Sequence, residues 1–228
     1  MPLAGIYEMM RHSARPFLIL CALACAGPAL AQEPAAPKSP YGFAAGIFAS
    51  SIIRGNAGPT TGFSEANYDD TFDTGAGLRL EGFREFTSDA RGQIGLVYAR
   101  WPGKFFMGGA FPAGAQYDDF SVIGPYIGGR ATYGSCGGFE PYLLANVGAV
   151  YLSSLTVQSG GATIPYWANS WKEYFEAGIG VARKTGSGTL TFDIRLTNFG
   201  APKAVDPAIA EATSVLSVYV GVGYEWKR

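Results

Sequence analysis

The sequence predicts an all-β fold, an eight-stranded antiparallel up-and-down β-barrel that spans a membrane. Three observations predict it: long segments in which apolar and polar residues alternate, connections that alternate between long and short, and aromatic residues near the segment ends. A period of two is typical of strands, because successive side chains point to opposite faces. The segments also reach the roughly 9–11 residues that a tilted strand needs to cross the hydrocarbon layer.

The N-terminal region predicts export. Arg11 and Arg15 precede the apolar run PFLILCALACAGPALA, which ends in Ala29-Leu30-Ala31. A basic region, a short apolar region and an A-x-A site form a secretory signal peptide, here residues 1–31. Residues 32–40 (QEPAAPKSP) read as a flexible leader, and the barrel is expected over 41–228. The predicted location is the outer membrane of a Gram-negative bacterium.

The rest of the chain divides into eight segments. We expect strands near 41–53, 73–86, 92–101, 119–133, 139–153, 171–183, 189–199 and 213–226. Short connections lie at 87–91, around Ser135 and Cys136, and at 184–188, and their Gly, Ser and Asp residues suit tight turns. Long connections cover about 54–72, 102–118, 154–170 and 200–212. Long connections at one end of a barrel are typical of extracellular loops, so both chain ends are expected in the periplasm.

The faces of the strands follow from the alternation. In Ser214–Trp226 one face is Leu216, Val218, Val220, Val222, Tyr224 and Trp226, and the other is Val215, Ser217, Tyr219, Gly221, Gly223 and Glu225. Aromatic residues fall near the strand ends, at Tyr41, Phe43, Tyr98, Trp101, Tyr151, Trp171, Tyr224 and Trp226. Such rings form the girdles of outer-membrane barrels at the two water–lipid boundaries. We therefore place the apolar faces against lipid.

Charged residues fall on the inward faces that this assignment predicts. They are Arg79, Glu81, Lys172, Glu176, Asp193, Arg195 and Glu225. The interior of an eight-stranded barrel is barely wide enough for side chains, and unpaired buried charge is costly. We expect Arg195 to lie near Lys172, Glu176 and Glu225. These residues form either a closed polar plug or the lining of a narrow or gated pore, and their charges do not choose between the two.

Histidine chemistry is excluded in the mature chain. The only histidine, His12, lies in the predicted signal peptide, so Ser–His–Asp catalysis and histidine metal sites are not available. No catalytic, cofactor-binding or metal-binding residue is predicted, and the protein is not expected to be an enzyme. Removal of the signal leaves 15 basic residues of 17 and 17 acidic residues of 18, a net charge of −2. This balance does not predict a nucleic-acid partner.

Two acidic segments and one cysteine could carry chemistry. NYDDTF (Asn67–Phe72) and QYDDF (Gln116–Phe120) pair aspartates with aromatic residues, and their oxygens could hold Ca²⁺ or Mg²⁺. Solvated acidic turns are the favoured interpretation. Cys136, in a Gly-rich turn, is interpreted as an inert thiol in preference to an intermolecular disulfide.

The C-terminal strand carries a family signal. Gly221, Tyr224 and Trp226 fit the Gly-x-x-Φ-x-Φ pattern that closes outer-membrane barrels, with Tyr219 at its usual polar position. The chain thus resembles the small eight-stranded outer-membrane barrels, such as the transmembrane domain of outer-membrane protein A and the related X-type proteins. It departs from them in that Lys227 and Arg228 follow the aromatic end, where many members stop at Phe. The resemblance implies contact with the barrel-assembly machinery, outer-membrane lipid and lipopolysaccharide.

Three classes of function remain. The leading prediction is a non-enzymatic protein with a structural or surface-interaction role, carried by four long extracellular loops whose ligand the sequence does not identify. The alternative is a narrow, porin-like passive pore for small solutes. A lipid-modifying outer-membrane enzyme that uses Ser–Lys or carboxylate chemistry is a minor alternative.

Overall fold

The structure, a computed structural model, describes residues 40–58, 66–108 and 110–227. The signal peptide expected over 1–31 and the leader up to residue 39 lie outside the described residues, and both stay predictions.

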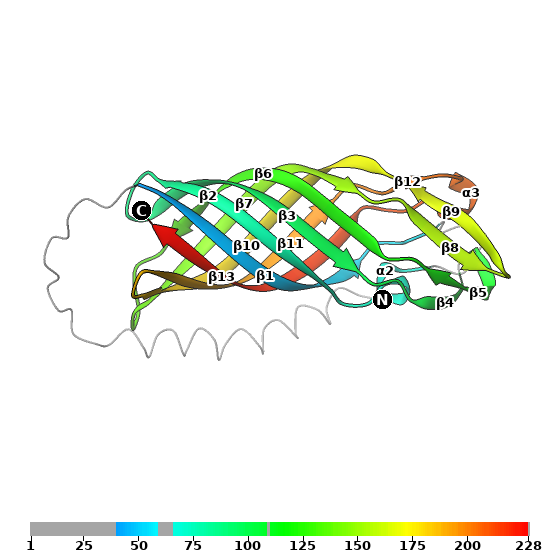
Figure 1. Cartoon of the computed structure of the whole chain (residues 1–228), viewed down its shortest axis with the longest axis horizontal. Helices are drawn as coiled ribbons and strands as arrows, with labels where there is room; N and C mark the ends of the chain where they lie inside the picture. The colour runs from blue at the N-terminus through cyan, green and yellow to red at the C-terminus, as the bar shows by residue number, and fades with distance from the viewer. Residues whose placement is uncertain (1–39, 59–65, 109, 228) are drawn as a thin grey trace, which may run out of the picture.

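The eight predicted strands form a closed antiparallel barrel (Figure 1). They are β1 (Tyr41–Arg54), β2 (Gly75–Glu85), β3 (Ala90–Trp101), β6 (Phe120–Thr132), β7 (Phe139–Leu152), β10 (Ser170–Thr185), β11 (Gly188–Phe199) and β13 (Val215–Lys227). Each strand pairs with the next along the chain, and β1 pairs with β13 to close the barrel. The predicted all-β, eight-stranded up-and-down fold is confirmed.

The long connections are not irregular loops. They contain β4 (Phe105–Gly108), β5 (Phe111–Tyr117), β8 (Leu155–Ser159), β9 (Ala162–Ala168) and β12 (Lys203–Ala204), which form a five-stranded sheet in the order β12-β9-β8-β5-β4. This sheet extends beyond one end of the barrel, opposite the short turns (Figure 1). The sequence did not predict these strands, because segments of two to seven residues are too short to show a clear alternation.

Two short helices complete the long connections. They are α2 (Tyr68–Thr71), which follows β1, and α3 (Pro207–Ala210), which precedes β13. Asp206 caps α3 by accepting a hydrogen bond from the Ala208 backbone N–H at 2.9 Å. Within the part of the chain that the structure describes, no helix has the length and apolar composition needed to cross a membrane.

The outer wall of the barrel is apolar, as the alternation predicts. Large exposed apolar side chains on the wall include Ile47, Leu78, Leu80, Ile94, Leu96, Ile123, Ile127, Leu143, Val147, Phe175, Ile179, Phe192, Ile194, Leu196 and Val220. Tyr41, Trp171 and Trp226 are also exposed near the strand ends, at the girdle positions. The girdle assignment of Trp101 is wrong: its side chain is fully buried inside the barrel, because it continues the inward row of Val97 and Ala99.

Glycine and proline shape the wall. Pro125 lies within β6 and points outward, and β6 pairs with β7 through Val122–Ile123 and again from Tyr126. This interruption follows from the missing N–H of proline. On the inner face, a Cβ at Gly95 would lie 2.6 Å from the Tyr126 ring. The glycine therefore makes room for a large side chain in the narrow interior.

Candidate functional site

The barrel interior brings together four of the predicted charged residues at mid-barrel. Glu176 on β10 accepts a hydrogen bond from Arg79 Nη2 at 2.6 Å and from Arg195 Nη1 at 2.9 Å. The same Arg195 nitrogen lies 3.4 Å from Glu81 Oε1. These four side chains come from three strands, β2, β10 and β11, and all are buried. They form a continuous ionic cross-link through the barrel.

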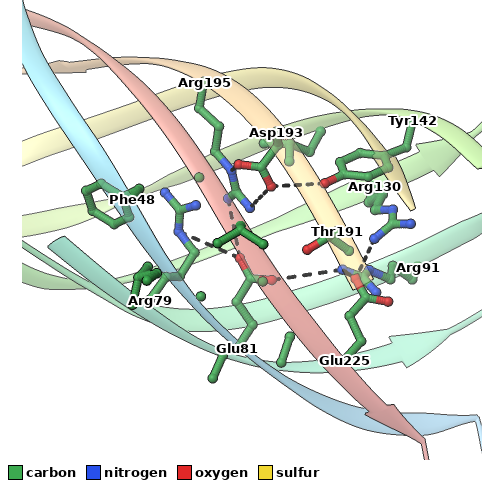
Figure 2. A pocket seen from close by; sticks show the side chains of 18 residues that line it. Phe48, Arg79, Glu81, Arg91, Arg130, Tyr142, Thr191, Asp193, Arg195 and Glu225 are labelled. Carbon is green, nitrogen blue, oxygen red and sulfur yellow. Dashed lines mark hydrogen bonds and ion pairs between the residues drawn. The ribbon is translucent and has the colours of Figure 1, made fainter. Parts of the chain in front are cut away.

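Asp193 and three tyrosines extend this cross-link. Arg195 donates to both oxygens of Asp193, through Nε at 2.8 Å and Nη2 at 2.9 Å (Figure 2). The Tyr142 hydroxyl donates to Asp193 Oδ2 at 2.9 Å, and those of Tyr126 and Tyr174 donate to Glu81 and Glu176 at 2.6 and 2.7 Å. Hydrogen bonds of this kind compensate the burial of the carboxylates.

Glu225 lies in a second ionic group, nearer the short turns. Its Oε1 lies 2.9 Å from Arg91 Nη2 and 2.5 Å from Arg130 Nη1 (Figure 2). The Arg130 guanidinium also stacks on Tyr142, 3.7 Å from the ring centroid. Arg91 connects the two groups through a 3.9 Å contact with Glu81. The sequence predicts that Glu225 lies near Arg195. In the structure the two residues belong to different ionic groups, so this prediction is wrong.

Sequence reasoning missed Arg91 and Arg130, and it expected Lys172, which shares the inward face of β10 with Tyr174 and Glu176, to lie near Arg195. Arg91 falls in the short connection expected over 87–91 but lies on β3, and Arg130 lies on β6, a segment in which we assign no charged residue to the inward face. Lys172 is half-buried near the long-connection end of β10, and it makes no ion pair with any described residue. The signal that could have found Arg91 is the inward row Arg91, Gln93, Gly95, which alternates with Ile94 and Leu96.

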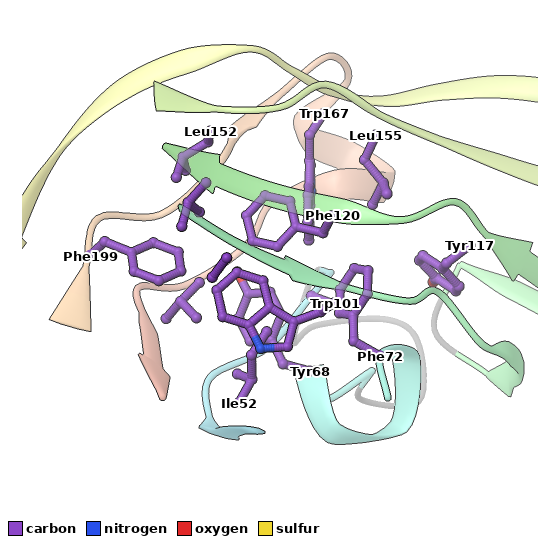
Figure 3. Packing of buried hydrophobic residues seen from close by; sticks show 14 of the residues in the cluster. Ile52, Tyr68, Phe72, Trp101, Tyr117, Phe120, Leu152, Leu155, Trp167 and Phe199 are labelled. Carbon is purple, nitrogen blue, oxygen red and sulfur yellow. The ribbon is translucent and has the colours of Figure 1, made fainter. Parts of the chain in front are cut away.

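The other end of the interior is closed by an aromatic cluster. Trp101 stacks on Phe120 with ring centroids 5.8 Å apart, and Phe120 contacts Trp167 edge-on at 5.4 Å (Figure 3). Phe72, which follows α2, lies 5.7 Å from Phe120, and Trp167 Nε1 donates to the Ala210 carbonyl at 3.0 Å. Strands β3 and β6 and three of the long connections therefore meet in one core. Burial raises the pKa of the Tyr68 hydroxyl, which lies within this core.

The space among the ionic groups is small. The cavity among the ionic groups measures about 30 Å³ and is lined by Arg79, Glu81, Arg91, Arg130, Asp193, Arg195 and Glu225, among others. A space of this size holds one or a few water molecules. Ionic groups on the side of the short turns and aromatic rings on the side of the long connections thus fill the barrel along its axis.

The acidic segments at the barrel mouth are engaged in hydrogen bonds or exposed. Asp119 accepts from Arg100 Nε at 2.8 Å and from the Gly103 N–H at 3.1 Å. The Gly103 N–H and the Arg100 guanidinium lower the pKa of Asp119. Asp69 and Asp70 are exposed in α2. Across the described residues, no three His, Cys, Asp or Glu side chains gather as a metal site would require.

The C-terminal residues of the family signal divide between the two faces of β13. Tyr219 is buried and stacks on Phe48 with centroids 4.4 Å apart, and Gly221 faces inward beside it. Trp226 is exposed on the outer wall, where Tyr224 packs against it edge-on at 4.9 Å. An outward aromatic pair is therefore presented at the end of the last strand.

Comparison with known proteins identifies the class of fold. No protein-family model and no curated protein matches this sequence. Among solved structures, the outer-membrane protein AlkL is similar, with 15% identity, a TM-score of 0.52, and coverage of 89% of this chain and 97% of AlkL. OprG from Pseudomonas aeruginosa has 14% identity and a TM-score of 0.51, over 84% of this chain and 98% of OprG. The chain therefore has the fold of the small eight-stranded outer-membrane β-barrels.

Proposed function

We propose that this protein is a non-enzymatic outer-membrane protein whose barrel holds the five-stranded sheet outside the cell as a surface for contacts with other molecules. The proposal is carried by the way the four long connections are joined in a ring. The first bonds the fourth through Asn56 N–H and Thr213 Oγ1 at 2.8 Å, and the second bonds the third through Asp118 N–H and the Thr156 carbonyl at 3.1 Å.

The remaining two junctions of the ring are hydrogen bonds between backbone groups. Lys104 N–H donates to the Thr71 carbonyl at 2.8 Å, and Val205 N–H donates to the Tyr166 carbonyl at 3.0 Å. The described parts of these connections are bonded to one another and packed on an aromatic core, which gives those parts a defined shape. This supports a surface for recognition over four independent flexible loops.

The filled interior opposes the pore alternative. A passive pore needs continuous water along its axis, whereas here arginine–carboxylate pairs and aromatic rings occupy that path. The same pairs oppose the enzyme alternative: Glu81, Glu176, Asp193 and Glu225 each form an ion pair with at least one arginine. A carboxylate already bonded to arginine in this way is not free to take a proton from a substrate.

The proposed surroundings follow from the outer wall and the last strand. The apolar wall would contact outer-membrane lipid, and the rim beneath the sheet would contact lipopolysaccharide. The barrel-assembly machinery would recognise the end of the last strand through Tyr219, Gly221, Tyr224 and Trp226. The outward Trp226 would be the contact residue.

The orientation can be tested with an epitope inserted after Gly160, in the turn between β8 and β9. We expect antibody to reach this epitope on intact cells, because the sheet lies outside the cell in the proposal. The matched control is the same epitope after Gly186, in the short turn between β10 and β11. Both glycines have positive φ, of 58° and 43°, and neither has a neighbour within 4 Å of a built Cβ, so both turns should tolerate insertion.

The two sites should give opposite results. The epitope at Gly186 should become reachable only after the outer membrane is permeabilised. Labelling at Gly186 on intact cells, together with none at Gly160, would reverse the orientation and refute surface display.

A further inference from the structure

A glycine interrupts one row of large apolar side chains on the outer wall and leaves a notch there. Across β13, β1, β2 and β3 the paired outward residues are Trp226, Phe43, Gly82 and Ile94. The three large side chains are 47%, 58% and 61% exposed, whereas Gly82 has no side chain at all. The result is a groove of about 480 Å³ along β2, bounded at the end nearer the middle of the barrel by Leu80, Leu96 and Pro125.

A cation lies beyond the lining residues of this groove, toward the barrel end. Arg84 is the next outward residue after Gly82 on β2, about 7 Å further along the strand, one residue before the strand ends. Its guanidinium lies over the rings of Tyr41 and Phe86, at 5.5 and 5.9 Å from their centroids. No carboxylate of the described chain lies within ion-pair distance of Arg84. The arginine is thus held at the barrel end and has its charge available.

We propose that this groove binds one glycerophospholipid from the leaflet at the short-turn end, with an acyl chain in the notch at Gly82 and the phosphate at Arg84. The inference rests on the proposed membrane location and goes beyond surface display. The wall of the groove is apolar and faces the hydrocarbon layer, which suits an acyl chain. Arginine binds phosphate through paired, charge-assisted hydrogen bonds, which supplies the complementary charge at the level of the headgroup.

The structure provides variants that separate the two halves of the site. In Gly82→Leu the new side chain fills the notch, and a Cβ built there meets only Ile94 Cγ2, at 3.9 Å, so the barrel should fold. Arg84→Gln removes the charge and leaves the notch open. The matched control is Arg183→Gln, because Arg183 is an exposed arginine 5.2 Å from the Phe139 ring centroid near the same barrel end. Beside Arg183 the next outward residue is Val181 instead of a glycine.

The test is native mass spectrometry of the full chain released from micelles that contain equal amounts of phosphatidylglycerol and lipid A. We expect the wild-type protein and Arg183→Gln to retain one phosphatidylglycerol. Arg84→Gln should weaken its retention by about tenfold, because one charge-assisted contact with the phosphate is lost. Gly82→Leu should weaken retention by about the same factor, because the acyl chain can no longer enter the notch. Heat-dependent gel mobility verifies that each variant is folded.

Three outcomes would overturn the proposal. Equal retention in all four proteins would mean that the lipid is held without a specific site. A loss in Arg84→Gln alone would mean a headgroup contact without the groove. Retention of lipid A in place of phosphatidylglycerol would assign the groove to the other lipid. None of these results depends on which end of the barrel faces the cell exterior, so they leave the epitope experiment to judge surface display.

Discussion

Replacement of Arg195 with alanine should lower the free energy of unfolding by about 3–5 kcal/mol, the typical cost of breaking a buried ion pair from one side. Arg195 contacts three carboxylates, those of Glu81, Glu176 and Asp193. It binds both oxygens of Asp193. Its removal leaves Asp193 with only the Tyr142 hydroxyl in a narrow interior. Urea unfolding of the protein refolded in lipid vesicles measures the change.

The matched control for this prediction is Arg100→Ala. Arg100 also pairs with an aspartate, Asp119, but its side chain is 59% exposed at the barrel mouth. Water solvates the remaining aspartate there, so the unfolding midpoint should change far less. Equal, small effects of both substitutions would mean that the interior is filled with water, which would favour the pore over the plug.

Replacement of Trp101 with alanine should also cost about 3–5 kcal/mol, as for other large aromatic residues in a packed core. The Trp101 ring is fully buried between Phe120 and Phe199, with centroids at 5.8 and 6.1 Å. Its Nε1 donates to Ser50 Oγ at 3.1 Å. The substitution therefore leaves a cavity between the barrel interior and the five-stranded sheet. It also leaves the buried Ser50 hydroxyl without the donor that Trp101 supplies.

Trp171→Ala is the control for Trp101→Ala. Trp171 lies on the outer wall near the same barrel end, is 60% exposed, and contacts Tyr151 edge-on at 5.6 Å. Its loss removes no interior packing, so its effect on unfolding should be clearly smaller. Should the two tryptophan variants unfold alike, the aromatic cluster would not be the core that joins sheet and barrel.

Much of the barrel could be predicted because its strands are constrained on both faces. In β2, β10, β11 and β13, lipid-facing and interior positions differ in polarity, and the predicted faces of Leu78, Arg79, Phe175 and Ile194 are those observed. Trp101 was misassigned because aromatic residues near a strand end suit either a girdle or an internal core. Trp101 shares the inward face of β3 with Val97 and Ala99, and only this alternation distinguishes a core position from a girdle position.

The partners within the interior could be predicted less well. Alternation gives the face on which Glu225 lies but not its depth along the barrel axis, which depends on strand tilt and stagger. Glu225 therefore pairs with Arg91 and Arg130 near the short turns, whereas Lys172 lies toward the other end. The sheet formed by the long connections depends on pairing between short segments distant in sequence, such as Gln116 with Gln158.

Single-channel recording on the full chain in planar lipid bilayers tests the central claim most directly, that this barrel is closed and serves to hold its outer sheet. Parallel samples in vesicles should show heat-dependent gel mobility, which verifies that the barrel is folded and inserted. The account predicts no steady conductance from the wild-type protein, because the ionic groups and the aromatic cluster fill its axis. A stable, ohmic conductance step at each insertion would contradict the account and assign the protein to the pores.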